Sequence, residues 1–358
     1  MGKSKFTKSK ISGVVSYVPS SIRYFDEDAK SSNFDPRQID KIKKNIGLNK
    51  RHVTTSKTTT LDLCYAASVD LLKGLKINKD DIDGLIFVTQ TPDHFQPCNA
   101  AIIHGMLNLS NECASFDVNL GCSGYVYGLW LSHMMIESGE CNKVLLLAGD
   151  TLSKCTNDKD RSTGFLFGDG GTASLVERSS YVNETFFSLN TNGHGSEYIK
   201  IPAGGFRLPK SNETKKEVTN SEGNTFSQEN LIMNGGEVFN FSISVEPESI
   251  QDIINYANLK IEDIDYVVFH QANKYIISNI ARRLKIPIEK TPMSTVERYG
   301  NQSSASIPCT INDSLGNELV CETKNVILSG FGVGLSWASC LTNLKLEYCP
   351  KVKIYREE

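Results

Sequence analysis

Two similar segments separated by a fixed interval constrain the fold of this chain more than any other feature. Residues 77–90 read INKDDIDGLIFVTQ, and residues 259–272 read LKIEDIDYVVFHQA. Aligning Asp81 with Asp263 gives an offset of 263 − 81 = 182 positions. In each segment a polar stretch precedes a continuous apolar run, a pattern that favours a buried strand.

A second pair of segments matches at the same offset. NKVLLLAG at 142–149 corresponds to KNVILSGF at 324–331, and Val144 and Val326 are 326 − 144 = 182 positions apart. A shared offset at two places indicates a duplicated unit. The alternative is that similar helices precede similar but unrelated buried strands.

Apolar runs that alternate with helical segments indicate an α/β fold. In the first half we expect strands at 84–89, 113–118 and 143–148 and helices at 58–75, 99–107 and 123–136. Runs of Val, Ile and Leu between helices are typical of strands covered on both faces, and they predict a mostly parallel sheet. We therefore expect two pseudo-symmetric α/β halves, residues 1–178 and 179–358, whose strand ends meet at one central crevice.

Composition and charge exclude several classes of protein. Hydrophobic residues make up 39% of the 358 residues and charged residues 22%, as in soluble globular proteins. A net charge of −3 gives no reason to expect nucleic acid or an anionic membrane as a partner. The apolar runs are too short to span a bilayer, the N-terminus does not resemble a secretory signal, and we expect a cytoplasmic protein. The ten cysteines include no CxxC pair and no zinc-type grouping, so free thiols in a reducing compartment are expected, and no metal.

One cysteine lies where a reactive thiol is favoured. Cys122 stands in SFDVNLGCSGYVYGLWL, between the end of a predicted strand and the start of an apolar helix. A helix N-terminus favours the thiolate, and Gly121 and Gly124 leave room for a substrate. A small buried residue in a strand-turn-helix connection is the alternative interpretation.

A histidine and an asparagine end two other predicted segments. His270 closes the apolar run YVVF and is followed by Gln271 and Asn273, although a histidine at such a position is more often a core residue. Asn301 follows a glycine in ERYGNQSSASIPC, where asparagine is usually a turn former. The offset of 182 pairs Cys122 with Ser304 and so places Asn301 on the symmetric copy of the cysteine turn.

Six segments together resemble the β-ketoacyl-ACP synthase III branch of the thiolase-like condensing enzymes. They occur in the family's order and spacing, from about residue 10 to about residue 340, and read DVNLGCSGYVYGL, FLFGDGGTASLV, MNGGEVF, HQANKYI, GNQSSASIP and GFGVGLSW. The resemblance implies a five-layered α-β-α-β-α thiolase-like fold, a homodimer, and a Cys-His-Asn catalytic set. It implies no resident cofactor, because the substrates are thioesters of CoA and of acyl carrier protein.

The resemblance also implies a role for each residue of the set. Cys122 would carry the starter acyl group as a thioester. His270 and Asn301 would donate hydrogen bonds to the thioester oxygen of a malonyl-type extender while carbon dioxide leaves. The backbone N–H groups of Cys122 and Val333 would form the oxyanion hole, in which each donor is typically worth about 3 kcal/mol.

Residues around the set match family positions that bind the carriers. Arg161, Phe239 and Asn273 correspond to positions that line the phosphopantetheine and CoA channel. A basic group on the helix after His270 is either a solvated face or a docking patch for an acidic acyl carrier protein; its members are Lys274, Arg282 and Arg283. Asp169 in FGDGG is expected to stabilise a buried turn.

Several positions depart from the family pattern. Val333 replaces the middle glycine of a triplet, Asn45 stands near the usual adenine-binding arginine, and Tyr275 stands where a basic residue is common. Gln96 occupies the place of a bulky apolar residue in the loop that caps the partner's acyl tunnel. These differences favour an unusual or polar starter, or a primer carrier other than CoA.

Three other functions share parts of this pattern. A thiolase-fold acyltransferase would pass the acyl group from Cys122 to an alcohol or amine without decarboxylation. A type III polyketide synthase also uses Cys, His and Asn. A non-catalytic partner subunit typically lacks the nucleophile, and the complete set therefore disfavours it.

Overall fold

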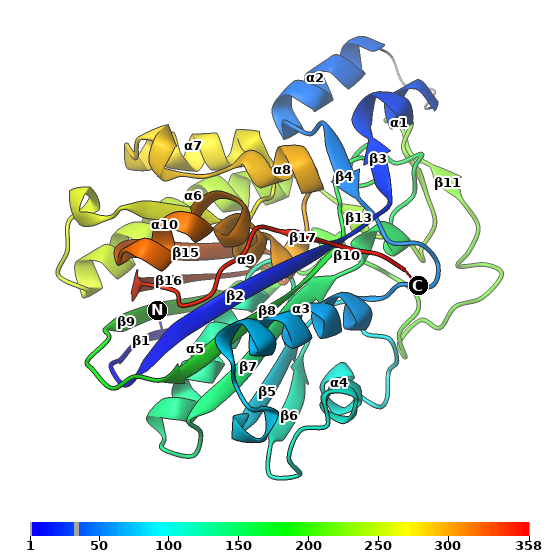
Figure 1. Ribbon diagram of the computed structural model, residues 1–358. Coiled ribbons are helices and arrows are strands. Elements are labelled where there is room, and N and C mark those ends of the chain that lie inside the picture. Colours follow the sequence, from blue (N-terminus) through cyan, green and yellow to red (C-terminus); the bar gives the residue numbers. More distant parts are fainter. Residues whose placement is uncertain (1, 32–35, 358) are drawn as a thin grey trace.

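A computed structural model describes residues 2–31 and 36–357 and arranges them around two large sheets (Figure 1). The first sheet has six strands, in the order β17 (Lys353–Tyr355), β2 (Ser9–Pro19), β8 (Gly170–Arg178), β7 (Lys143–Asp150), β5 (Gly84–Val88) and β6 (Ala114–Val118). The second has five strands, in the order β1 (Gly2–Phe6), β9 (Thr185–Thr191), β16 (Ser336–Leu344), β15 (Lys324–Gly332) and β14 (Tyr266–Phe269).

Helices form three layers around these sheets and complete a five-layered α-β-α-β-α fold (Figure 1). The outer layer on the first sheet contains α3 (Thr60–Leu75) and α4 (Asn99–Leu107). The outer layer on the second sheet contains α6 (Gly235–Tyr256) and α7 (Lys274–Leu284). The central layer contains α5 (Gly124–Glu137), α9 (Ser306–Thr310), the π-helical turn η7 (Ile311–Leu315) and α10 (Gly316–Cys321).

The central layer holds the largest apolar core. Leu129 of α5 and Ile307 of α9 pack between Val14 and Leu146 of the first sheet and Val326 of the second, and all five side chains are fully buried. Full burial of such a side chain stabilises the fold by about 1.5–3 kcal/mol. The helices of both halves therefore join the two sheets into one body.

The predicted duplication appears in the register of the strands. Gly84 of β5 pairs with Val144 of β7, and Tyr266 of β14 pairs with Val326 of β15 in the same parallel arrangement, at the offset of 182. A hydrogen bond from a backbone N–H to an aspartate carboxylate is also repeated at this offset. The Lys143 N–H donates to Asp83 Oδ2 at 3.0 Å, and the Asn325 N–H donates to Asp265 Oδ2 at 2.8 Å. The similarity of the two segments thus reflects a repeated local structure, in which Val144 and Val326 and Asp83 and Asp265 are identical pairs.

The prediction of parallel pairing is confirmed for the three expected strands of the first half, β5, β6 and β7, but each complete sheet is mixed. β8 runs antiparallel to β2 and β7, and β16 runs antiparallel to β9 and β15. The connection between β15 and β16 consists of residues 333–335 only. Such a connection is too short for the crossover that two parallel neighbouring strands need. The chain ends also exchange sheets: β1 joins the second sheet and β17 the first, so the two sheets do not divide at residue 178 alone.

Smaller elements lie around one end of the two sheets. β3 (Ile22–Tyr24) pairs with β4 (Lys50–His52), and α1 (Phe25–Ser31) and α2 (Pro36–Ile46) lie beside them (Figure 1). A polar segment at 210–230 contains two short paired strands, β11 (Val218–Thr219) and β12 (Thr225–Phe226). The residues on either side of this segment form a second short pair, β10 (Ile199–Lys200) and β13 (Ile232–Met233). α8 (Ser294–Tyr299) precedes Asn301. Within the described residues, no helix combines the length and apolar character needed to cross a membrane.

Candidate active site

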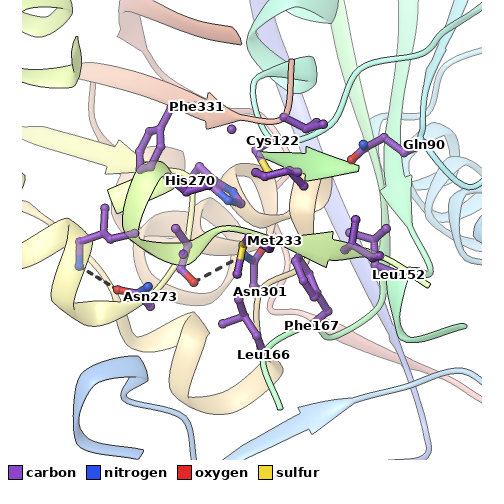
Figure 2. Close-up of a pocket in the computed structure, with 18 residues that line it drawn as sticks. Gln90, Cys122, Leu152, Leu166, Phe167, Met233, His270, Asn273, Asn301 and Phe331 are labelled. Atoms are coloured by element: carbon purple, nitrogen blue, oxygen red, sulfur yellow. Dashed lines mark hydrogen bonds between the residues drawn. The ribbon is translucent and has the colours of Figure 1, made fainter. Parts of the chain in front are cut away.

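Three residues from both halves of the chain line one cavity (Figure 2). Cys122 precedes α5, His270 follows β14, and Asn301 follows α8. The cavity has an empty volume of about 670 Å³, including open solvent at its mouth. Its apolar lining includes Leu152, Leu166, Phe167, Ile199, Leu231, Met233, Val238 and Ile276. A largely apolar cavity whose lining includes a thiol and two polar side chains suits a mostly uncharged arm with a reactive end.

The turn that carries Cys122 is packed tightly by neighbouring side chains and backbone. A methyl group at Gly121 would overlap Gln90 Oε1, and one at Gly330 would lie 2.6 Å from the Cys122 carbonyl oxygen. A methyl group at Gly332 would lie 2.8 Å from Cys122 Sγ. Glycine at these positions lets the end of β15 approach the cysteine turn closely.

Burial controls the protonation of the cysteine. Loss of solvent raises the pKa of the Cys122 thiol to about 12, although the Ser303 hydroxyl and the backbone N–H groups of Val333 and Cys122 act in the opposite direction. Loss of solvent, the largest of these effects, favours the thiol form, whereas the hydrogen bonds favour the thiolate. That the helix N-terminus adds to the second group of effects stays a prediction. The same two N–H groups that face the sulfur are the pair expected to form the oxyanion hole.

A Gly332→Ala substitution is expected to slow acylation of Cys122 by about a hundredfold. The added methyl group would lie 2.8 Å from the sulfur and 2.9 Å from Cβ of Cys122, and a displacement of about 1 Å at a reacting centre can cost this much. Mass spectrometry of acyl transfer from acyl-CoA would measure the rate. Gly193→Ala is the matched control, because a methyl group there meets nothing within 4 Å. Wild-type acylation in Gly332→Ala would contradict the close packing.

His270 is held as a neutral ring. Its backbone N–H donates to the Ser329 carbonyl at 2.7 Å, and Nδ1 lies 2.7 Å from the Ser306 hydroxyl. Burial lowers the pKa of the imidazole to about 3. The Ser306 hydroxyl has a single hydrogen and lies close to both Nδ1 and, at 2.8 Å, the Ser303 carbonyl. When this hydrogen points to Nδ1, Nε2 carries the ring proton and is the ring nitrogen that can donate to a ligand.

Asn301 is fixed through its backbone and through its amide. Its N–H donates to the Leu166 carbonyl and its carbonyl accepts from the Gly168 N–H, both at 3.0 Å. Oδ1 accepts from the Ser303 N–H at 2.9 Å. Nδ2 donates to the Ala272 carbonyl at 3.4 Å (Figure 2). These bonds orient the amide, and Nδ2 retains a second hydrogen for a ligand.

Of the three residues predicted to line the channel, one lines the cavity and two lie outside it. Asn273 lines the cavity, and its Oδ1 accepts the Ile276 N–H and caps α7. Phe239 stacks on Tyr275 with ring centroids 5.3 Å apart, and Arg161 donates to Asn224 Oδ1 and to the Glu222 carbonyl. Among the described residues neither Phe239 nor Arg161 lines the cavity.

The basic residues of α7 are partly engaged with the protein itself. Lys274 forms an ion pair with Glu297 at 2.7 Å, and Arg283 donates to the Ile243 carbonyl at 2.6 Å. Arg282 is exposed in the last turn of α7. Of the three, Arg282 offers the most accessible positive charge.

Several residues of the site were not identified from the sequence. Gln90 lines the cavity beside Cys122, and Ser303 and Ser306 contact the cysteine and the histidine respectively. Both serines lie inside the GNQSSASIP segment, so their proximity to Asn301 was the available signal. Asp169 stabilises a buried turn, as expected, by accepting bonds from the backbone and hydroxyl groups of Thr54 and Ser153.

Comparison with known proteins identifies the family. The model of the 3-oxoacyl-[acyl-carrier-protein] synthase III family matches residues 116–195, and the model of its C-terminal part matches residues 254–344. A putative 3-oxoacyl-[acyl-carrier-protein] synthase 3 of Campylobacter jejuni is 37% identical over 99% of both chains. A β-ketoacyl-[acyl-carrier-protein] synthase III of Fusobacterium nucleatum is 33% identical over 92% of this chain and 97% of its own length.

A solved structure agrees with these sequence matches. The 3-oxoacyl-(acyl-carrier protein) synthase from Burkholderia xenovorans superimposes with a TM-score of 0.91 at 36% identity, covering 98% of this chain and 99% of that chain. Sequence and fold therefore agree over nearly the whole length. This chain belongs to the 3-oxoacyl-acyl-carrier-protein synthase III family of thiolase-fold condensing enzymes and is an acyltransferase of that type.

Proposed function

We propose that this enzyme extends an acyl thioester by decarboxylative Claisen condensation with malonyl-ACP, using Cys122, His270 and Asn301. The proposal is supported by the way one thiol and two oriented polar side chains line the same largely apolar cavity. Family membership implies thioesters of CoA and of acyl carrier protein as the substrate class.

The first step transfers the starter acyl group to the cysteine. The Cys122 sulfur attacks the carbonyl carbon of the donor thioester, and the departing CoA sulfur takes the thiol proton. The oxyanion that forms in between lies within reach of the N–H groups of Cys122 and Val333. Donors that are already in position stabilise this charge without reorganisation.

The second step generates the carbon nucleophile. The malonyl thioester oxygen accepts hydrogen bonds from His270 Nε2 and Asn301 Nδ2, and negative charge grows on it as carbon dioxide leaves. A neutral imidazole donor suits this role, because its pKa of about 3 keeps its charge constant from pH 5 to pH 8. The carbanion then attacks the acyl-Cys122 carbonyl, and the sulfur leaves and regains a proton.

The carriers would approach from the mouth of the cavity, near Asn273 and α7. Arg282 would provide positive charge for an acidic carrier protein, with Lys274 and Arg283 after release of their present contacts. A homodimer belongs to the same proposal. Phe95 is 74% exposed and contacts the 87% exposed Phe206, with the two rings tilted by 43°. It precedes Gln96 in the loop that would cap the partner's tunnel.

Peptide mass spectrometry after incubation with a panel of acyl-CoAs would test the first step. We expect one acyl group on the peptide that contains Cys122, none in Cys122→Ala, and a preference for particular chain lengths or polarity. Acylation on another cysteine would contradict the assignment of the nucleophile. Acylation only from acyl-ACP would replace CoA as the donor and leave the rest unchanged.

A further inference from the structure

A serine lies between the nucleophile and a glutamine at the inner end of the cavity. Ser303 Oγ is 3.9 Å from Cys122 Sγ, within hydrogen-bond range for sulfur, and it donates to Gln90 Oε1 at 3.2 Å. The three side chains therefore form a chain of contacts that starts at the sulfur. Figure 2 shows the amide of Gln90 pointing toward Cys122.

The backbone at Ser303 has an unfavourable conformation. Its φ of 49° lies in the left-handed region, which is unfavourable for a residue with a side chain. The Ser303 N–H donates to Asn301 Oδ1, and the Ser303 carbonyl lies 2.8 Å from Ser306 Oγ. Strain of this kind persists where the surroundings over-determine it, and it is concentrated at functional sites.

Gln90 is itself held in place from two sides. Its backbone N–H donates to Asp150 Oδ1 at 2.7 Å, and its amide occupies the space that a side chain at Gly121 would need. Asp150 also accepts hydrogen bonds from the N–H and the hydroxyl of Ser304, the residue that the offset of 182 pairs with Cys122. The Ser303 hydroxyl thus meets a fixed partner.

We propose that Ser303 is a positioning residue that activates Cys122 by hydrogen bonding to its sulfur, with Gln90 orienting the hydroxyl. The proposal rests on Cys122 being the nucleophile of the proposed function. In the thiol, S–H donates to Ser303 Oγ, whose O–H donates to Gln90 Oε1. As the sulfur becomes anionic, the hydroxyl turns and donates to it, because a serine hydroxyl can either donate or accept.

The other titratable groups near the sulfur do not supply this bond. His270 is neutral, and its Nδ1 is occupied by Ser306. Asp150 raises the pKa of the thiol through its charge. Among the described residues, Ser303 is the side chain that hydrogen-bonds to Cys122 and favours its ionisation.

Two substitutions separate the hydroxyl from the backbone. Ser303→Ala removes the hydroxyl and keeps the strained backbone, whereas Ser303→Gly removes the hydroxyl and relieves the strain. The pH dependence of iodoacetamide alkylation, followed on the Cys122 peptide, would report the thiol pKa in each variant. We expect both variants to react about fivefold to tenfold more slowly at a fixed pH below that pKa, with the profile moved to higher pH. Ser68→Ala is the matched control, since Ser68 is a buried serine that donates within α3, to the Cys64 carbonyl.

Gln90→Glu and Gln90→Leu test the second contact. The carboxylate of Gln90→Glu would place negative charge next to the hydroxyl and is expected to raise the thiol pKa further than Gln90→Leu does. An unchanged alkylation profile in both Ser303 variants would overturn the proposal. Alkylation does not require a substrate, so a failure of condensation would leave this result intact and would count against the proposed function alone.

Discussion

The His270→Ala variant is expected to accept an acyl group on Cys122 at close to the wild-type rate and to lose condensation by about a hundredfold to a thousandfold. Removal of one preorganised donor to a developing oxyanion typically has this effect. The hydroxyl that contacts the sulfur belongs to Ser303, whereas Nδ1 of His270 contacts Ser306, so acylation does not depend on the ring. Separate measurements of acyl-enzyme formation and of β-ketoacyl-ACP release would resolve the two steps.

The pH dependence of malonyl-ACP decarboxylation provides a second test of the role of His270. The pKa of His270 is about 3, so decarboxylation of malonyl-ACP should show no acid limb from this residue between pH 5 and pH 8. Asn301→Ala should resemble His270→Ala, and the double variant should lose less than the product of both effects. His194→Ala, an exposed histidine, is the control. Parallel loss of acylation and condensation in His270→Ala would instead give the ring a role in activating Cys122.

Glu246→Gln is expected to stabilise the protein increasingly as the pH rises from 5 to 9. Glu246 of α6 is fully buried, and its Oε2 accepts from the Ser329 hydroxyl at 2.5 Å. Oε1 has no hydrogen-bond partner among the described residues. Burial raises the pKa of this carboxyl group from 4.5 to about 8.

The direction of this pH dependence follows from proton binding to Glu246 in the folded and unfolded states. Between pH 4.5 and pH 8 the folded protein holds a proton on Glu246 that the unfolded chain has lost, so wild-type stability is fully present below 4.5 and decreases as the pH rises through this range. At 1.36 kcal/mol for each pH unit, the loss amounts to about 3–5 kcal/mol. A glutamine has nearly the same shape and no such proton.

Urea unfolding of both proteins at pH 5 and pH 8.5 would measure the difference. The free energy of unfolding of Glu246→Gln, relative to wild type, should rise by about 3 kcal/mol or more between these two pH values. Glu248→Gln, an exposed carboxylate on the same helix, is the matched control. An equal difference at both pH values would show that Glu246 is not buried as the structure has it.

Local and repeated features of the fold could be predicted from the sequence. The boundaries of α4 agree with the prediction, and those of α3, β5 and β7 differ from it by at most two residues, because short apolar runs between polar turns define them. The offset of 182 predicted a ladder that repeats with the same register. Cys122, His270 and Asn301 were found because each stands at the end of such a segment and within a family motif.

Features that depend on distant contacts could not be predicted in this way. Strand direction depends on how the chain returns, so the antiparallel β8 and β16 were missed, as was the exchange of β1 and β17. The pKa of the Cys122 thiol depends on residues of both halves, because Ser303 and Val333 of the second half act on it together with loss of solvent. Ser303 acquires its contact with Cys122 across 181 positions of sequence, which no local pattern records.

The most direct test of the central claim follows one turnover from acyl-Cys122 to the carrier protein. Purified acyl-enzyme would be mixed with malonyl-ACP, and the mass of the carrier protein and the release of carbon dioxide would be measured together. The account predicts one carbon dioxide for each β-ketoacyl-ACP formed, with loss of the acyl group from Cys122. Transfer of the acyl group to a hydroxyl or amine acceptor, without carbon dioxide release, would contradict it.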